Sequence, residues 1–237
     1  MLAGDRGIAY RGELMPPPPR RPLSSTEIAL DTLNLSPALL ALAERAAPRR
    51  YRKGVLLIQE GEIGDTLYIV LSGRVKVFSL GSNDREITFG LYGPGEFVGE
   101  MSLDGGPRAA SVITTEATSC AVITRTTLLE HIAQYPEFAL ELLAKVIRRA
   151  RLATRDARNM ALVDSYGRLS VLLDEMTVPQ PDGTRAVTAR LTHSEIASRI
   201  GCSREMVSRL LKDLERGGYV EMRAGNLHLL KTLPPRW

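Results

Sequence analysis

The amino-acid sequence predicts an α+β fold, in which an antiparallel β-roll of the jelly-roll type precedes a long helix and a C-terminal winged helix-turn-helix. Short β-branched and aliphatic runs separated by turn residues occupy positions 51–124, as expected for an antiparallel barrel or sandwich. After Pro136, apolar and small residues recur at alternating steps of four and three, which indicates a helix with one continuous seam. Near the C-terminus, two short helical segments flank Gly201 and precede a hairpin pattern, which is typical of a winged helix-turn-helix.

The composition is that of an ordinary globular protein. The chain has 237 residues, of which 44% are hydrophobic, so one or two domains with a sizeable core are expected. The net charge of +4 is too mild to establish a nucleic-acid partner, so the position of the basic residues matters more. No secretory signal is found, and no run approaches the ~18 apolar residues that a membrane span needs. We therefore expect a cytoplasmic protein without a membrane partner.

The pattern divides the chain into four segments: a mobile N-terminal arm (1–23), a β-roll domain (24–135), a long dimerisation helix (136–163) and a winged helix-turn-helix domain (164–237). The arm contains the run Pro16–Pro19, and proline resists both helix and sheet. We expect a passive tail, with a contact from Arg20 and Arg21 to DNA phosphates as the alternative.

Two short helices are expected before the first strand. Ser24–Glu27 has the spacing of a capping box, and Ser36-Pro37 is a second helix start. The strands that follow are predicted from their aliphatic runs, namely 55–58, 67–71, 75–78, 87–89 and 120–123.

The long helix carries a coiled-coil seam made of Leu143, Ile147, Ala150, Thr154, Ala157 and Ala161. Its small residues would let two helix backbones approach closely, so a homodimer is predicted; packing on the chain's own barrel, through Leu142 and Val146, is the alternative. A group of arginines lies elsewhere on the helix: Arg148, Arg149, Arg151, Arg155 and Arg158. Another helix is expected near 166–176, and the turn at Pro179–Gly183 follows it.

The helix-turn-helix is predicted from its caps and its apolar faces. Thr192–Glu195 is a capping box, Gly201 can supply the positive φ of the turn, and Ser203 caps the second helix. The inward positions are Ile196 and Ile200 on the first helix, and Val207, Leu210, Leu211 and Leu214 on the second. The hairpin pattern at 219–222 and 227–230, around the turn Gly225-Asn226, adds the wing.

The second helix has the side chains of a DNA reader, and the predicted contacts are Ser203, Arg204, Glu205, Ser208, Arg209 and Lys212. Arginine can bond bidentately to guanine, and glutamate can accept a hydrogen bond from cytosine. A carboxylate beside phosphate would be costly for a nonspecific binder, so Glu205 favours base reading over an ordinary helix with solvated charges.

These residues resemble the catabolite activator protein family, also called the cyclic AMP receptor and fumarate-nitrate regulator family, over about 33–230. The segment Gly201–Arg209 is similar to the recognition helix of the cyclic AMP receptor subgroup. The resemblance implies that Arg204, Glu205 and Arg209 read a TGTGA-type half-site, in a palindrome matched to the two-fold axis of a dimer. It also implies double-stranded operator DNA as the partner, and RNA polymerase as a further partner if the protein is an activator.

The segments 95–103 and 107–112 resemble the phosphate-binding cassette of cyclic-nucleotide-binding domains. The implied ligand residues are Gly99, Glu100, Met101, Arg108, Ala109 and Thr154. Backbone amides and the Arg108 fork suit a phosphate, Glu100 suits a ribose hydroxyl, and the family pattern places Thr154 against the base.

The cassette departs from the bacterial cyclic AMP receptor at Ala109 and Ala153, where that receptor carries hydroxyl residues. The Arg-Ala-Ala arrangement instead resembles kinase regulatory subunits that bind cyclic AMP, so cyclic AMP remains the favoured effector. Cyclic GMP, cyclic di-GMP or no ligand are the alternatives within the family. A purely structural cassette would have Arg108 paired with an internal carboxylate.

Other function classes fit the sequence less well. Cys120 and Cys202 are too distant for an iron-sulfur cluster or a zinc site, and the three histidines (His131, His193 and His228) are expected at the surface or as caps, not as haem ligands. We therefore expect no metal, haem or cluster. A cyclic-nucleotide module of a kinase or channel would not need the Arg204-Glu205 helix. The cassette holds no nucleophile with a supporting base, so the protein is not expected to be an enzyme.

Overall fold

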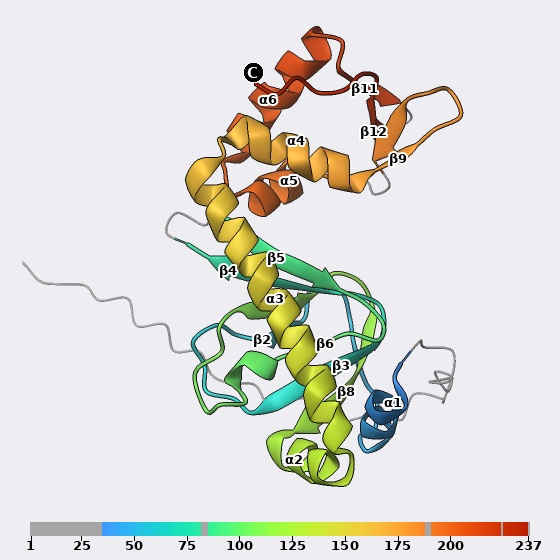
Figure 1. The fold of residues 1–237 in the computed structure, drawn as a ribbon, viewed down its shortest axis with the longest axis vertical. Helices are drawn as coiled ribbons and strands as arrows, with labels where there is room; N and C mark the ends of the chain where they lie inside the picture. Colours follow the sequence, from blue (N-terminus) through green and yellow to red (C-terminus); the bar gives the residue numbers. More distant parts are fainter. Residues whose placement is uncertain (1–34, 82–84, 188–190, 224, 237) are drawn as a thin grey trace, which may run out of the picture.

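A computed structural model describes residues 35–81, 85–187, 191–223 and 225–236. The N-terminal arm and the helix expected at Ser24 lie outside the described residues. The described chain forms two lobes, a β-roll and a C-terminal domain, and the long helix α3 runs from one to the other (Figure 1). This order of elements confirms the predicted α+β fold.

The β-roll consists of two four-stranded antiparallel sheets, with the strand orders β1-β8-β3-β6 and β2-β7-β4-β5. Its strands are β1 (Arg49–Tyr51), β2 (Leu56–Ile58), β3 (Thr66–Ser72), β4 (Val75–Leu80), β5 (Glu86–Tyr92), β6 (Phe97–Val98), β7 (Ser111–Thr114) and β8 (Thr118–Thr124). All five predicted strands are present. The three that the sequence did not mark, β1, β6 and β7, are only two to four residues long, too short to show a period.

The core of the roll lies between its inner strand faces and three helices. Leu67, Ile69 and Leu71 alternate along one face of β3 and pack in this core, while Val70 is buried on the opposite face. The expected helix after Ser36 is α1 (Pro37–Glu44), which the Ser36 hydroxyl caps by accepting from the Leu39 amide at 3.1 Å. This helix packs on the same core as Phe138, the buried residue near the start of α3.

Helix α2 (Arg125–Gln134) was not predicted, and it overturns one expectation. His131 lies on its inner face with 0% of its surface exposed, so its placement as a surface or capping residue is wrong. Its ring contacts Tyr135 at 4.7 Å and Phe138 at 5.2 Å between ring centroids. Burial lowers the pKa of His131, because the charged imidazolium is disfavoured away from water.

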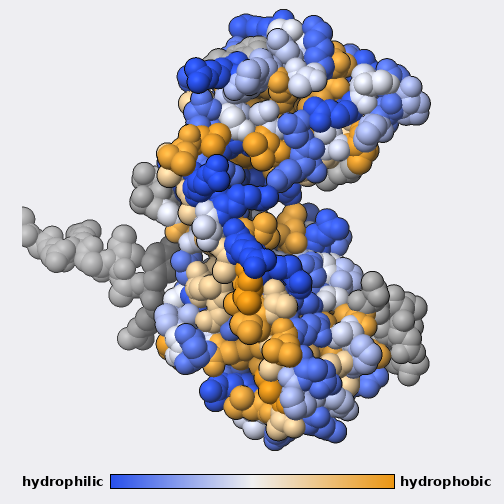
Figure 2. Space-filling model, in the orientation of Figure 1, coloured by the Kyte–Doolittle hydropathy of each residue, from blue (hydrophilic) through white to orange (hydrophobic). Residues whose placement is uncertain are grey.

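Helix α3 (Pro136–Leu162) has 27 residues, and so is about 40 Å long at 1.5 Å per residue. Phe138 is its single fully buried side chain, whereas the seam residues Leu143 and Ile147 are 52% and 41% exposed. Leu142 packs on the roll as anticipated, but Val146 stays exposed. Figure 2 shows apolar residues gathered over the lower half of α3 and strongly hydrophilic residues over its upper half. The large apolar side chains of the seam are therefore uncovered in the single chain.

The C-terminal domain has its own core and a four-stranded sheet, in the order β11-β12-β10-β9. Its elements are α4 (Ser165–Met176), β9 (Thr177–Pro179), β10 (Arg185–Val187), α5 (His193–Ile200), α6 (Arg204–Arg216), β11 (Val220–Arg223) and β12 (Asn226–Leu229). The wing hairpin β11–β12 is confirmed, and the turn predicted at Pro179–Gly183 joins β9 to β10, which extend the wing sheet.

The two lobes also touch directly, where α5 packs against β5 (Figure 1). The Thr88 and Ser198 hydroxyls lie 3.1 Å apart, and Arg85 donates to the Gly201 carbonyl at 3.3 Å. No helix of the described residues is long and apolar enough to cross a membrane.

Candidate functional site

The cassette of the β-roll is a tight turn between β6 and a short 3-10 helix over Glu100–Ser102. Gly99 has a φ of 96°, and a Cβ there would lie 2.6 Å from the Thr66 carbonyl oxygen. Only glycine therefore fits, because a side chain would meet both a strained φ and fixed backbone. Glycine is therefore required at position 99 because two backbone segments approach each other closely there, beside the expected phosphate site.

Arg108 is the central cation of the cassette and is 7% exposed. Its guanidinium donates to the Gly99 carbonyl at 2.9 Å, to the Ser102 hydroxyl at 2.7 Å and to the Thr66 hydroxyl at 2.8 Å. All three acceptors are neutral, so the alternative of a pair with an internal carboxylate does not describe this site. Burial is the main cause that lowers the pKa of Arg108. A buried cation held by neutral dipoles is suited to an added anion, which would offset its desolvation.

Glu100 faces a partner that the sequence did not single out. Arg149 of α3 donates to Glu100 Oε1 and to the Phe97 carbonyl, and its guanidinium lies 4.4 Å from the Tyr92 ring centroid. The Glu100 carboxylate is 5% exposed, which makes this a largely buried pair. The helical repeat in the sequence could have distinguished Arg149 from the other arginines. Those at positions 148, 151, 155 and 158 recur at steps of three and four and form one stripe on the helix, to which Arg149 does not belong.

The remaining predicted ligand residues lie at the surface. Met101 is 64% exposed, Ala109 is exposed, and the Thr154 hydroxyl donates to the Ala150 carbonyl of its own helix at 2.9 Å. Thr154 lies about 7.5 Å beyond Arg149 along the helix axis. The fold therefore brings Gly99, Glu100 and Arg108 together, while Thr154 stands apart on α3.

The second candidate site is the exposed face of α6. The Ser203 hydroxyl accepts from the Met206 amide at 3.2 Å, which confirms it as the cap, and Gly201 has the predicted left-handed φ of 64°. The four apolar residues of the helix, Val207, Leu210, Leu211 and Leu214, are buried in the C-terminal core. Arg204, Glu205, Arg209 and Lys212 consequently face solvent.

Two of the predicted reading residues have local partners. Hydrogen bonds from its own backbone amide and from the Ser203 hydroxyl lower the pKa of Glu205, so it stands ready as an ionised acceptor. The Ser208 hydroxyl donates to the Arg204 carbonyl at 3.0 Å and lies 2.8 Å from His193 Nδ1 of α5. Because its single hydroxyl proton is donated to the Arg204 carbonyl, Ser208 can only accept a hydrogen bond from His193. This contact joins the two helices of the motif.

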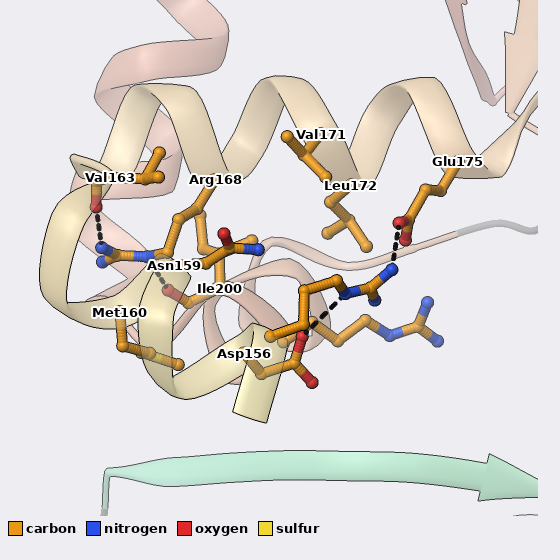
Figure 3. A pocket seen from close by; sticks show the side chains of 11 residues that line it. Asp156, Asn159, Met160, Val163, Arg168, Val171, Leu172, Glu175 and Ile200 are labelled. Atoms are coloured by element: carbon orange, nitrogen blue, oxygen red, sulfur yellow. Dashed lines mark hydrogen bonds and ion pairs between the residues drawn. The ribbon is translucent and has the colours of Figure 1, made fainter. Parts of the chain in front are cut away.

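A small cavity marks the hinge between α3 and the C-terminal domain (Figure 3). Its volume is about 90 Å³, and it is lined by Arg155, Asp156, Asn159, Met160, Val163, Arg168, Val171, Leu172, Glu175, Arg199 and Ile200. Arg168 donates to the Ile200 carbonyl at 2.7 Å and also to that of Val163, and Arg155 pairs with Glu175 at 3.4 Å. The hinge thus carries polar contacts from α3 to α4 and from α4 to α5, the first helix of the motif.

The described residues contain no cluster of histidine, cysteine or carboxylate side chains that could hold a metal ion. Cys120 is buried within the β-roll, and burial raises the pKa of its thiol to about 12.

Comparison with known proteins extends these observations. A family model of the cyclic nucleotide-binding domain matches residues 48–135, and one of the Crp-like helix-turn-helix domain matches residues 167–232. The chain is 33% identical over 189 residues to the CRP-like cAMP-activated global transcriptional regulator of Mycobacterium tuberculosis, covering 78% of this chain and 84% of that protein. It is 34% identical over 197 residues to the cyclic AMP receptor protein of Thermus thermophilus, covering 82% of this chain and 89% of that protein.

A solved structure of similar fold is that of the c-di-GMP responsive global regulator CLP of Xanthomonas campestris. The TM-score is 0.72 at 27% sequence identity, and the match covers 82% of this chain and 99% of that one. The two matched domains contain the two sites described above, the cassette and the exposed face of α6.

Proposed function

Because the chain belongs to the CRP/FNR family of DNA-binding transcription regulators, we propose that it is a cytoplasmic homodimer whose affinity for operator DNA is set by cyclic AMP. The observation that carries the effector proposal is Arg108, a buried cation that the protein's own acceptors leave without a negative partner. A cyclic phosphate at this position would supply that charge.

The cassette also offers places for the rest of the nucleotide. Arg149 binds Oε1 of Glu100, so Oε2 is the acceptor we assign to the ribose 2′-hydroxyl. Gly99 lets the backbone approach the phosphate, Met101 and Ala109 border it, and Thr154 is assigned to the base. Cyclic di-GMP is the second candidate, because the Xanthomonas relative of similar fold responds to it.

The dimer is proposed to form along α3. Its seam residues are exposed in the single chain, and two copies packed in parallel would cover them. Such a dimer places two copies of α6 about one helical turn of DNA apart, which matches a palindromic operator. The four segments 1–23, 24–135, 136–163 and 164–237 are its proposed arm, ligand domain, dimerisation helix and DNA-binding domain.

Within each half-site we assign base reading to Arg204, Glu205 and Arg209, on a TGTGA-type sequence. Their side chains are exposed along the face of α6 opposite its buried residues. Ser203, at the cap, and Lys212, one turn beyond Arg209, are assigned to the phosphate backbone. Ser208 is assigned a weaker contact with DNA, because its hydroxyl is already bonded to His193. RNA polymerase is a further partner if the protein activates transcription.

Calorimetric titration with cyclic AMP, cyclic GMP and cyclic di-GMP, each followed by a gel shift on a TGTGA palindrome, tests the proposal. We expect cyclic AMP to bind and to raise operator affinity over a scrambled palindrome, since a ligand acts only through its differential affinity for the two states. Tight operator binding that none of the three nucleotides changes would contradict the switch. Equal binding to both palindromes would contradict the reading assignment.

A further inference from the structure

His131 is a buried titratable side chain that lies outside both candidate sites. It is on the inner face of α2, where 0% of its surface is exposed and its ring contacts those of Tyr135 and Phe138. Neither ring nitrogen has a hydrogen-bond partner among the described residues. A buried ring of this kind is tolerated only while it is neutral, because a charge there would lose its hydration without a compensating bond. Protonation of His131 is therefore expected to disrupt the packing around it.

Charged groups face His131 from each of the helices around it. Burial is the main cause that lowers its pKa. The backbone of Ala38 on α1 raises the pKa without forming a hydrogen bond of normal geometry, Arg45 of α1 lowers it, and Glu137 of α3 raises it. On α2 itself, Glu130 Oε2 lies 3.8 Å from Arg45 Nη1, and strand β8, which also contacts α2, has no charged side chain. Burial outweighs the opposing causes, so the ring is neutral at neutral pH.

Helix α1 is held in place by the same group of helices. Its four buried residues pack in one core cluster with Phe138. At its C-terminal end Arg45 donates to the Gln134 side chain of α2, and at its N-terminal end the Ser36 hydroxyl donates to Glu141 of α3. An isolated helix of eight residues is unstable in water, so α1 depends on this docking.

Contacts along α3 connect α1 to the cassette. We define the inner stripe of α3 as Glu141, Lys145 and Arg149, which lie on one face of the helix because they are four residues apart. Lys145 Nζ lies 3.6 Å from Glu141 Oε1 and 4.6 Å from the ring centroid of Phe97. Arg149 in turn donates to the Phe97 carbonyl and to Glu100. The inner stripe therefore joins the N-terminal end of α1 to the carboxylate that we assign to the ribose.

We propose that acid and the nucleotide act on α1 in opposite directions: protonation of His131 releases the helix from the roll, and nucleotide binding holds it in place. The nucleotide part of this inference rests on the proposed function. When α1 leaves, the ring of His131 reaches water and regains its ordinary pKa of 6.5. Between this value and the lower pKa of the docked state, the released state binds one more proton, so its share rises by at most about tenfold per pH unit of acidification. Above the ordinary pKa both states carry a neutral ring, and pH does not shift the docking through His131.

The nucleotide is expected to act through the inner stripe. A ribose bound to Glu100 would depend on a carboxylate that Arg149 keeps in place, so the docked state of α1 should bind the nucleotide more tightly. Because the coupling between two sites is reciprocal, the bound nucleotide then favours the docked state by the same factor.

Hydrogen exchange on the whole protein measures the docking of α1, because its amides exchange when the helix leaves the roll. Their protection factors, corrected for the intrinsic rate at each pH, should fall several-fold in the wild type between about pH 7.5 and about pH 5.5. His131→Leu has no titrating ring and should show no fall, and His131→Phe gives the same test if the leucine variant does not fold. His228→Leu, which removes a histidine of the wing, is the matched control and should fall as the wild type does.

Saturating cyclic AMP should raise the protection of the α1 amides several-fold. Lys145→Met breaks the inner stripe between Glu141 and Phe97, so cyclic AMP should no longer protect α1 in this variant, while the effect of acid should persist. Arg148→Met, on the exposed face of α3, is its matched control and should keep both effects.

Equal falls of protection in the wild type and in His131→Leu would overturn the acid part of the proposal, as would a wild type whose protection does not change with pH. Cyclic AMP that protects the cassette amides around Gly99 without protecting α1 would overturn the nucleotide part. If no cyclic nucleotide protects the cassette, the proposed function fails and the nucleotide part fails with it. The comparison of the wild type with His131→Leu still decides the acid part.

Discussion

In the cassette of the β-roll, the charged side chains Glu100, Arg108 and Arg149 are already bonded to other atoms of the protein, and two of them are almost fully buried. Along α6 the opposite holds: Arg204 and Arg209 are exposed, and no ion pair is found for either of them within the described residues. Both regions carry charged side chains that we assign to a ligand, but in the cassette these are bonded within the protein, whereas on α6 they are exposed to solvent.

The difference follows from what each region does in the free protein. A buried charge without a partner is costly, so the cassette must satisfy its own groups, and a ligand must fit the arrangement it finds. An exposed arginine is solvated at little cost, so it needs no protein partner in the free state and can bind a base edge when DNA is present. Changes in the cassette should therefore alter stability or ligand response, whereas changes of the exposed arginines on α6 should alter DNA affinity alone.

The largest expected effect is the loss of ligand stabilisation on changing Arg108→Glu. At about 1,000 times its dissociation constant, cyclic AMP should raise the free energy of unfolding of the wild type by about 4 kcal/mol. The variant places a carboxylate at the phosphate position, so the rise should vanish. Chemical denaturation with and without cyclic AMP measures it, and Arg108→Lys serves as the control that keeps the charge. A full rise in Arg108→Glu would mean that the nucleotide binds elsewhere.

The next effect is the cost of breaking the pair between Arg149 and Glu100. Arg149→Leu leaves a carboxylate that is 5% exposed without its partner, and should lower the free energy of unfolding by about 3 kcal/mol. Arg148→Leu, one residue away on the exposed face, is the matched control and should change it by less than about 0.5 kcal/mol. Adding Glu100→Gln to Arg149→Leu should recover part of the loss. Equal free energies of unfolding for Arg149→Leu and Arg148→Leu would show that the buried pair does not stabilise the protein. The contrast drawn between the cassette and α6 would then be wrong.

On the reading helix, Arg209→Ala should weaken operator binding by about 1–3 kcal/mol and relax the preference at one guanine. The unfolding midpoint should stay at the wild-type value, because the side chain is exposed and no ion pair of it is found among the described residues. Gel shifts on palindromes changed one base at a time measure the preference. An equal loss on random DNA would show that Arg209 contacts phosphate only.

The smallest effect concerns the cap of the same helix. Ser203→Ala removes the acceptor of the Met206 amide and should cost about 1 kcal/mol of domain stability. Ser203→Asp restores an acceptor and should recover most of it, while Ser194→Ala, at an exposed position of α5, should be neutral. Thermal unfolding measures all three. A neutral Ser203→Ala would show that packing alone fixes the start of α6.

The elements that the sequence determined by itself are those with local signals. The caps at Thr192 and Ser203, the left-handed Gly201 and the apolar face of α6 depend on residues within one or two turns of each other, so their spacing predicts them. The same holds for the long helix, predicted over 136–163 and found over Pro136–Leu162. Glycine and arginine in the cassette were likewise identified from a short motif, as part of the resemblance to a known family.

Tertiary structure alone decided the contacts between distant segments. Arg149 meets Glu100 across 49 positions of sequence, and His131 is buried because an unpredicted helix folds onto α3. The Thr114 hydroxyl donates to the Arg52 carbonyl and the Thr115 amide donates to the Arg74 carbonyl, so one segment holds together two turns that are far from it in the chain. Periodicity and capping report only on neighbours along the chain, whereas burial and electrostatic pairing depend on which surfaces the folded chain brings together.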